Sequence, residues 1–197
     1  MTRDVVVNDA VEDNRPLPFV TAFVALARCA LRTAVLLLRG AVMLPRAHVD
    51  DVIGFADGSH GRVYRETVVR GAATDDPTLL VVAFRLRGVR GPLHAVFRAE
   101  SLLNTPLFVG FPGFVSKLWL AHDEHGRYRG VYQWNGLRRA DAYVRALWWV
   151  LALVSERSSI HYVAVTGVGR DQVLADPSIL ERVAGSSTSM WWRPAVR

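Results

Sequence analysis

Cysteine is nearly absent from this chain. Cys29 is the only cysteine in 197 residues, and it lies inside an apolar run. A disulfide within the chain is therefore excluded, and a reducing compartment is favoured. The first residues are acidic rather than basic, which is the opposite of the start of a secretory signal. We expect a cytoplasmic location.

Lysine is equally scarce. Lys117 is the only lysine, the other strongly basic residues are all arginines, and the formal net charge is +6. Arginines scattered over strands and helices are typical of a solvated surface rather than of a nucleic-acid footprint. An RNA-recognition module would also need an aromatic residue on its first strand, where this chain has Leu79, Leu80 and Val81. We expect no nucleic-acid partner.

Several catalytic and cofactor motifs are also missing. The chain has no nucleophile elbow, no phosphate loop and no paired cysteines, and its Gly167–Gly169 segment lacks the third glycine of a dinucleotide site. His122 and His125 flank two acidic residues in a short connection. A polar turn explains this segment without a metal, which would need about four ligands in a fixed geometry. We predict neither a metal nor a bound cofactor.

The sequence is rich in hydrophobic residues. Hydrophobic residues make up 51% of the chain, enough to bury the core of one good-sized domain with an extension. Periodicity and turn residues predict alternating strands and helices, with a tight hairpin in the middle. In chain order these cover residues 79–86, 91–104, 113–120, 128–134, 140–154 and 160–166. The β-α-β-β-α-β order predicts an α+β protein with a ferredoxin-like domain over residues 77–170.

An extension precedes this domain and a tail follows it. Residues 1–76 are predicted to form an acidic arm with a short strand, an apolar helix over 17–45 and a β-hairpin over 50–70. Residues 171–197 are predicted to form a short helix and a tail. Trp191 and Trp192 in this tail are expected to dock on the rest of the protein.

The helix predicted over residues 17–45 is apolar almost all round. Its charged residues Arg28, Arg32 and Arg39 fall within a sector of roughly 40° at 100° per residue. Such a helix must hide most of its surface. The longest uncharged stretch, residues 16–27, is shorter than a membrane span of about 20 residues. Two alternatives remain: contact with a membrane surface through lipid phosphates, or burial between the domain and a partner subunit.

Three segments of the ferredoxin-like part resemble a known family. Residues 113–119, 130–132 and 140–143, followed by the long apolar helix, are similar to YdhR-type monooxygenases of the dimeric α/β-barrel superfamily. The resemblance covers about residues 78–168. It implies a homodimer and a cofactor-independent oxygenation of an aromatic substrate. The superfamily also contains enzymes of other classes, so the fold alone does not determine the reaction.

A carboxylate on the first helix of the domain is the sharpest candidate for chemistry. Glu100 falls in the middle of the apolar stripe that includes Phe97, and Asn104 lies one turn further on. A carboxylate on an apolar face is costly unless it is paired or protonated, so such groups are candidates for general acid or base catalysis. A buried ion pair, with Lys117 or an arginine, is the structural alternative.

Lys117 and several aromatic residues are the next candidates. Lys117 lies in the middle of a strand between apolar neighbours, on the same face as Trp119, while Tyr132 and Trp134 share a face of the next strand. An ammonium among aromatic rings can bind an anionic or phenolic substrate. An aromatic core with a lysine at a subunit interface is the alternative. His161 is either a base or a core histidine.

We therefore predict an enzyme acting on a hydrophobic, aromatic or polyketide-like small molecule. Glu100 or His161 would remove a substrate proton, Asn104 and Lys117 would stabilise the oxyanion, and four aromatic residues would line the pocket. These are Phe97, Trp119, Tyr132 and Trp134. A cyclase or isomerase would use the same parts. A non-catalytic subunit that uses the helix over 17–45 to bind a membrane or protein is the third alternative.

Overall fold

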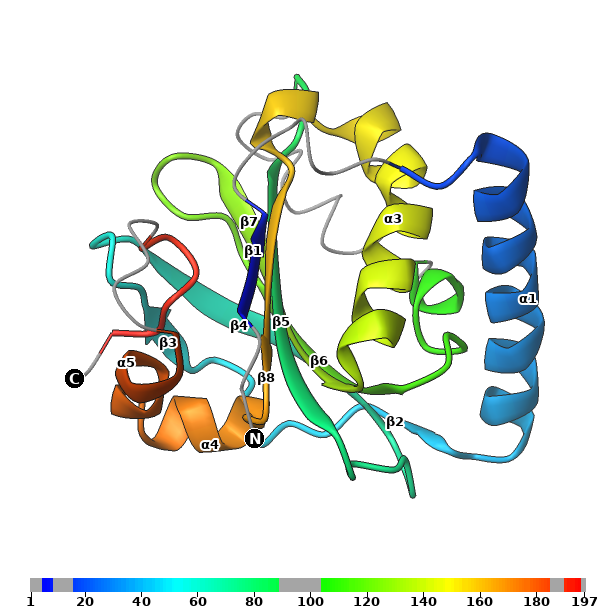
Figure 1. The fold of residues 1–197 in the computed structure, drawn as a ribbon, viewed down its shortest axis with the longest axis horizontal. Coiled ribbons are helices and arrows are strands. Elements are labelled where there is room, and N and C mark those ends of the chain that lie inside the picture. Colours follow the sequence, from blue (N-terminus) through cyan, green and yellow to red (C-terminus); the bar gives the residue numbers. More distant parts are fainter. Residues whose placement is uncertain (1–4, 9–15, 89–103, 185–189, 196–197) are drawn as a thin grey trace.

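The computed structural model describes residues 5–8, 16–88, 104–184 and 190–195 (Figure 1). Within these ranges the protein is a mixed α+β structure around one antiparallel sheet, with helices on both sides. The helix predicted over 91–104, with Glu100 and Phe97, lies almost entirely outside the described residues.

The sheet is larger than that of a ferredoxin-like domain. Its described strands follow the order β1-β8-β5-β7-β6-β4-β2, and β3 pairs with β4 beside this path. The N-terminal hairpin therefore belongs to the sheet, because β4 pairs with β6 from Val63 to Val68. The strands are β1 (Val5–Asn8), β2 (Val42–Met43), β3 (Val52–Gly54), β4 (His60–Val69), β5 (Pro77–Arg85), β6 (Phe114–Leu120), β7 (Arg127–Asn135) and β8 (His161–Thr166).

Helices cover the two faces of the sheet unequally. One face carries α3 (Leu137–Val154) and the short 3-10 helix η1 (Thr105–Leu107), with α1 (Phe19–Leu38) outside them (Figure 1). The other face carries α4 (Arg170–Ala175), α5 (Ser178–Ala184) and the C-terminal tail. A second 3-10 helix, η2 (Arg157–Ser159), precedes β8.

Alternating side chains of the strands build a separate core on each face. On β5, Leu80 and Val82 join the aromatic core under α3, while Leu79 and Val81 join the aliphatic core on the other side. The predicted docking of the tail is confirmed, because Trp192 is fully buried in this second core.

The two predicted hairpins are confirmed, and the turn residues explain both. Gly58 and Gly126 adopt positive φ angles of 83° and 73° at the tips of the hairpins. In the second turn the Asp123 carboxylate accepts the backbone N–H groups of His125 and Arg127, each at 2.9 Å. The polar segment around His122 therefore closes a turn.

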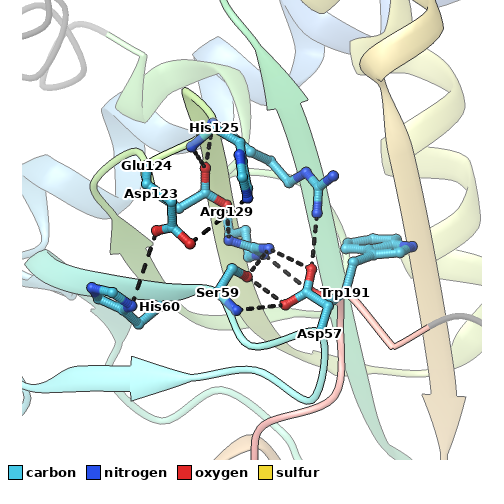
Figure 2. Close-up of polar contacts among 9 residues, drawn as sticks. Asp57, Ser59, His60, Asp123, Glu124, His125, Arg129 and Trp191 are labelled. Atoms are coloured by element: carbon cyan, nitrogen blue, oxygen red, sulfur yellow. Dashed lines mark hydrogen bonds and ion pairs between the residues drawn. The ribbon is translucent and has the colours of Figure 1, made fainter.

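Arg129 ties the two hairpins together (Figure 2). Its Nη1 donates to Asp123 at 2.8 Å, its Nη2 donates to the Ser59 hydroxyl at 2.7 Å, and its Nε donates to the carbonyl of Trp191 at 3.1 Å. A second buried ion pair joins Arg170 Nη2 to Glu66 Oε1 at 2.7 Å. Both guanidinium groups lie on the face of the sheet that α4 and the tail cover.

Towards the ends of the chain the structure differs from the prediction in the length of one helix and in the presence of another. The apolar helix ends at Leu38 rather than near residue 45, because Gly40 takes a positive φ of 62° and residues 42–43 form β2. A short helix, α4, was not predicted, since six residues are too few for a clear period. The face of the sheet opposite α3 is covered by Ile53 and Phe55 of the N-terminal extension together with the segment after residue 169.

Gly110 shows how closely α1 is packed on the loop after η1. A Cβ atom at residue 110 would lie 2.1 Å from the carbonyl oxygen of Cys29 and 2.8 Å from the backbone nitrogen of Thr33. Only a residue without a side chain allows the two backbones to approach this closely.

Gly110→Ala is therefore expected to lower the free energy of unfolding by about 1–3 kcal/mol, because the helix or the loop must move. Thermal unfolding followed by circular dichroism measures the change. Gly54→Ala is the control, since its added Cβ would meet its nearest atom at 3.9 Å. Equal unfolding temperatures for the two variants would contradict this account of α1 packing.

Candidate functional site

A cavity lies on the α3 side of the sheet. Its volume is about 260 Å³, and it is enclosed by strands β4 to β7, the η1 segment and one side of α3. Most of its wall is aromatic or aliphatic, with few polar groups, as in many small-molecule sites. The residues that line it include Tyr64, Asn104, Phe108, Lys117, Trp119, Tyr132 and Tyr143.

Lys117 enters this cavity because of its position on β6. Its neighbour Leu118 points into the opposite core, so the alternation of the strand directs Lys117 and Trp119 to the α3 side. Lys117 is only 6% exposed. Its Nζ lies 3.1 Å from the centroid of the Trp119 ring and 4.7 Å from those of Phe108 and Tyr132. Aromatic faces therefore replace most of the water around the amine.

Burial lowers the pKa of Lys117 well below 10.5, and the positive charge of Arg65 lowers this pKa further. Burial penalises the charged form of an amine, and a neighbouring cation has the same effect. Lysines in such surroundings serve as proton acceptors or nucleophiles in enzymes. The neutral amine of Lys117 is thus favoured more than in a solvated lysine.

Arg65 is the site residue that sequence reasoning missed. It is 8% exposed, and its guanidinium carbon lies 4.2 Å from the centroid of the Trp119 ring. Nη2 donates to the Thr105 hydroxyl at 3.2 Å, while Nε and Nη1 are buried and have no hydrogen-bond partner within the described part of the chain. Burial lowers the pKa of Arg65 to about 10.

A β-bulge explains why the sequence did not reveal Arg65. The register between β4 and β6 shifts between Val63 and Arg65, so consecutive residues Tyr64 and Arg65 both contact Trp119. Simple alternation would put these two side chains on opposite faces. The sequence around it, with Arg62, Glu66 and Thr67 in the same strand, gave no signal that Arg65 is buried.

Two cations thus contact the same indole. Among the described residues, no carboxylate lies within ion-pair distance of Lys117 or Arg65, in contrast to Arg129 and Arg170 on the other face. A buried charge without a counterion is costly, and a buried N–H group without an acceptor adds to that cost. A bound anion would satisfy both cations, so the electrostatics of the cavity favour a negatively charged ligand.

Two tyrosines form the part of the wall next to Lys117. The hydroxyl groups of Tyr132 and Tyr143 are 3.1 Å apart, and burial raises the pKa of both phenols. Both therefore stay protonated and can donate hydrogen bonds. Gly130 makes room for this arrangement, since a Cβ there would lie 2.6 Å from Cε2 of Tyr132.

The structure brings only some of the predicted site residues together. Asn104, Lys117, Trp119 and Tyr132 all line the cavity. Trp134 does not; it lies fully buried behind Tyr143, with the two ring centroids 4.9 Å apart. Glu100 and Phe97 lie outside the described residues.

His161 is separated from this site by the sheet. Its strand places it with Val163 and Val165 on the α4 side, and its ring centroid lies 6.0 Å from that of Trp191. The expectation that His161 and Lys117 act on one substrate is therefore corrected. The sequence did place His161 with Val163 and Val165, but it could not show that Lys117 faces the other way.

Comparisons with models of protein families, with curated proteins and with solved structures found no significant match to this chain. The resemblance to YdhR-type monooxygenases therefore stays a prediction, and the function must be argued from the cavity itself.

Lys117→Met is expected to raise the free energy of unfolding by about 1–4 kcal/mol, because an apolar side chain of similar length replaces a desolvated amine. The folded-state pKa of Lys117 is below that of the unfolded chain, so the wild-type protein gains stability as pH rises from the folded pKa toward 10.5. The advantage of the variant should be greatest at low pH and shrink as pH rises. Urea unfolding at several pH values measures this change.

Arg62→Met, at a side chain that is 67% exposed, is the control and should show no such pH-dependent gain. A loss of stability in Lys117→Met at every pH would mean that the ammonium has a counterion in the folded protein.

Proposed function

We propose that this protein is an enzyme that binds a small aromatic molecule in the cavity and removes a proton from it. The observation that carries this proposal is the pair of buried basic side chains, Lys117 and Arg65, over the Trp119 ring, with no carboxylate near either among the described residues. The aromatic walls suit a flat apolar substrate, and the cations suit the oxyanion that forms when the substrate loses its proton.

Lys117 is the proposed base. Its neutral amine accepts a proton from an acidic C–H or O–H group of the substrate. This transfer converts the uncharged amine and the uncharged substrate into an ammonium and an anion. The new ammonium then faces the charge that it created, close to the Arg65 guanidinium. Asn104 adds an amide group at the edge of the cavity. Neither ion has to be brought in from water, because both arise inside the site.

The strand order supports a ferredoxin-like core for this enzyme. The strands β8-β5-β7-β6 are adjacent and antiparallel, as a split βαβ arrangement requires, and the additional strands extend the sheet at both edges. In this proposal the carbanion reacts with dioxygen, so that a CH₂ group becomes a carbonyl group and the second oxygen atom leaves as water. This oxygenation, and the homodimer that goes with it, rest on the resemblance of residues 78–168 to the YdhR-type family.

Ligand charge provides the first test. Naphthoate should bind the wild-type protein about tenfold to a hundredfold more tightly than naphthamide, because only the carboxylate forms charged hydrogen bonds with Lys117 and Arg65. Isothermal titration measures both affinities. Lys117→Met and Arg65→Met should each lose most of this preference, whereas Arg62→Met should keep it.

The affinity for naphthoate should also fall as pH rises, since Lys117 loses its charge above its lowered pKa while the carboxylate stays ionised. This pH dependence should be absent in Lys117→Met. Equal affinities for naphthoate and naphthamide, at any pH, would rule out an anion site in the cavity.

Proton removal is tested separately from binding. β-Tetralone in D₂O should exchange its acidic CH₂ protons faster with the protein than without it, and NMR follows the exchange. Lys117→Met should lower the rate by about a hundredfold or more, as expected for loss of a general base. A variant that binds tetralone but exchanges it at the wild-type rate would show that Lys117 is not the base.

A further inference from the structure

The outer face of α1 is apolar and exposed to an extent unusual for a soluble protein. Eight of its large hydrophobic side chains are between 41% and 89% exposed, and only Ala22, Cys29 and Thr33 are buried. Exposed apolar surface that forms one continuous strip marks an interaction site. The exposed side chains are Phe19, Val20, Phe23, Val24, Leu31, Val35, Leu37 and Leu38.

The domain holds α1 at both ends and in the middle. Near its start, Trp149 Nε1 donates to the Leu17 carbonyl at 2.8 Å; in the middle, Cys29 Sγ donates to the Pro106 carbonyl at 3.1 Å. After its end, the N–H of Arg70 donates to the carbonyl of Ala41 at 2.8 Å. By length and composition α1 could cross a membrane. A crossing would break these contacts, but a helix lying flat on a membrane keeps them.

Positive charge lies along one flank of this apolar face. Between residues 19 and 38 the helix has no acidic residue, and Arg32 and the following Arg39 lie on the side next to the loop after η1. Arg32, Arg39 and Arg139 line a groove of about 540 Å³ there, together with apolar residues of α1 and the loop. Guanidinium groups beside an apolar wall match a lipid, which has a phosphate next to its acyl chains.

The strip is too narrow for a stable contact with a second copy of the chain. A helix of 20 residues is about 30 Å long and 10 Å wide, so one face offers about 300 Å². A stable protein interface needs about 800 Å² from each partner. A bilayer has no such threshold, because its surface continues beyond the helix.

We propose that α1 lies in the plane of an anionic membrane surface. Its outer face enters the boundary between head groups and acyl chains, and Arg28, Arg32 and Arg39 contact lipid phosphates. Phe19 and Phe23 belong to the inserted face, and the Phe19 ring packs edge-on against Trp149 at 5.7 Å. Aromatic rings at this depth are typical of proteins that dock on membranes. The cavity on the inner side of α3 would thus lie close to a source of apolar molecules.

Vesicle flotation of the full chain tests this proposal. The protein should float with vesicles that contain phosphatidylglycerol and stay in solution with vesicles of phosphatidylcholine alone. Replacing Arg28, Arg32 and Arg39 by glutamine should weaken binding about a hundredfold, at about fivefold for each arginine. Replacing Val20, Phe23 and Leu31 by serine should abolish it. Replacing Arg62, Arg85 and Arg182 by glutamine changes the net charge equally and should leave binding close to wild type.

Three outcomes would overturn the proposal. Equal binding to both kinds of vesicle would exclude a preference for an anionic surface, and resistance of the bound protein to alkaline carbonate would indicate a spanning helix. No flotation, together with a dimer in sedimentation that the serine variant dissociates, would assign the strip to a second copy of the chain. Naphthoate binding by the serine variant would show that its cavity is intact.

Discussion

The Trp119 ring is the element on which the site depends. Its Nε1 donates to the Thr67 hydroxyl at 3.3 Å, which fixes the plane of the indole between β4 and η1. Lys117 and Arg65 both approach this ring, and in this way the sheet holds two buried basic side chains beside the cavity. A ring face attracts a cation by about 2 kcal/mol when water is excluded, less than full desolvation of an ion costs. The ring alone therefore does not offset the cost of burying a charge at this position.

The buried arginines on the two faces of the sheet have different partners. On the α4 side, Arg129 and Arg170 each have a carboxylate partner at 2.8 and 2.7 Å, and these pairs join segments that are distant in the sequence. On the α3 side, Arg65 has no carboxylate partner among the described residues, and two of its nitrogens find no hydrogen-bond acceptor there, compared with one nitrogen of Arg170. The first arrangement is that of a structural network, and the second is that of a binding site. This contrast within one sheet is why we place function on the α3 side.

Sequence reasoning predicted the local elements well, because hairpins, turn glycines and apolar periods depend on neighbouring residues. The Asp57–Gly58 turn, the hairpin before Trp134 and the strand with Lys117 all follow from such patterns. The position of Arg65 does not follow from such a pattern, because the bulge after Val63 changes the face of the sheet to which the next side chains point. The opposite orientations of His161 and Lys117 depend on pairing across the whole sheet, which no local pattern contains. Of the predicted site, Lys117, Asn104, Trp119 and Tyr132 do meet.

The close contact between α1 and the turn that contains η1 links the outside of the molecule to the cavity. Cys29 Sγ donates a hydrogen bond to the carbonyl of Pro106. On one side of Pro106, the Thr105 hydroxyl accepts a hydrogen bond from Arg65. On the other side, Leu107 lines the cavity. Because Gly110 leaves no gap beneath the helix, α1 cannot tilt or slide without displacing this turn. A movement of α1 would therefore displace Pro106 and, with it, the adjacent Thr105, whose hydroxyl accepts a hydrogen bond from the buried Arg65.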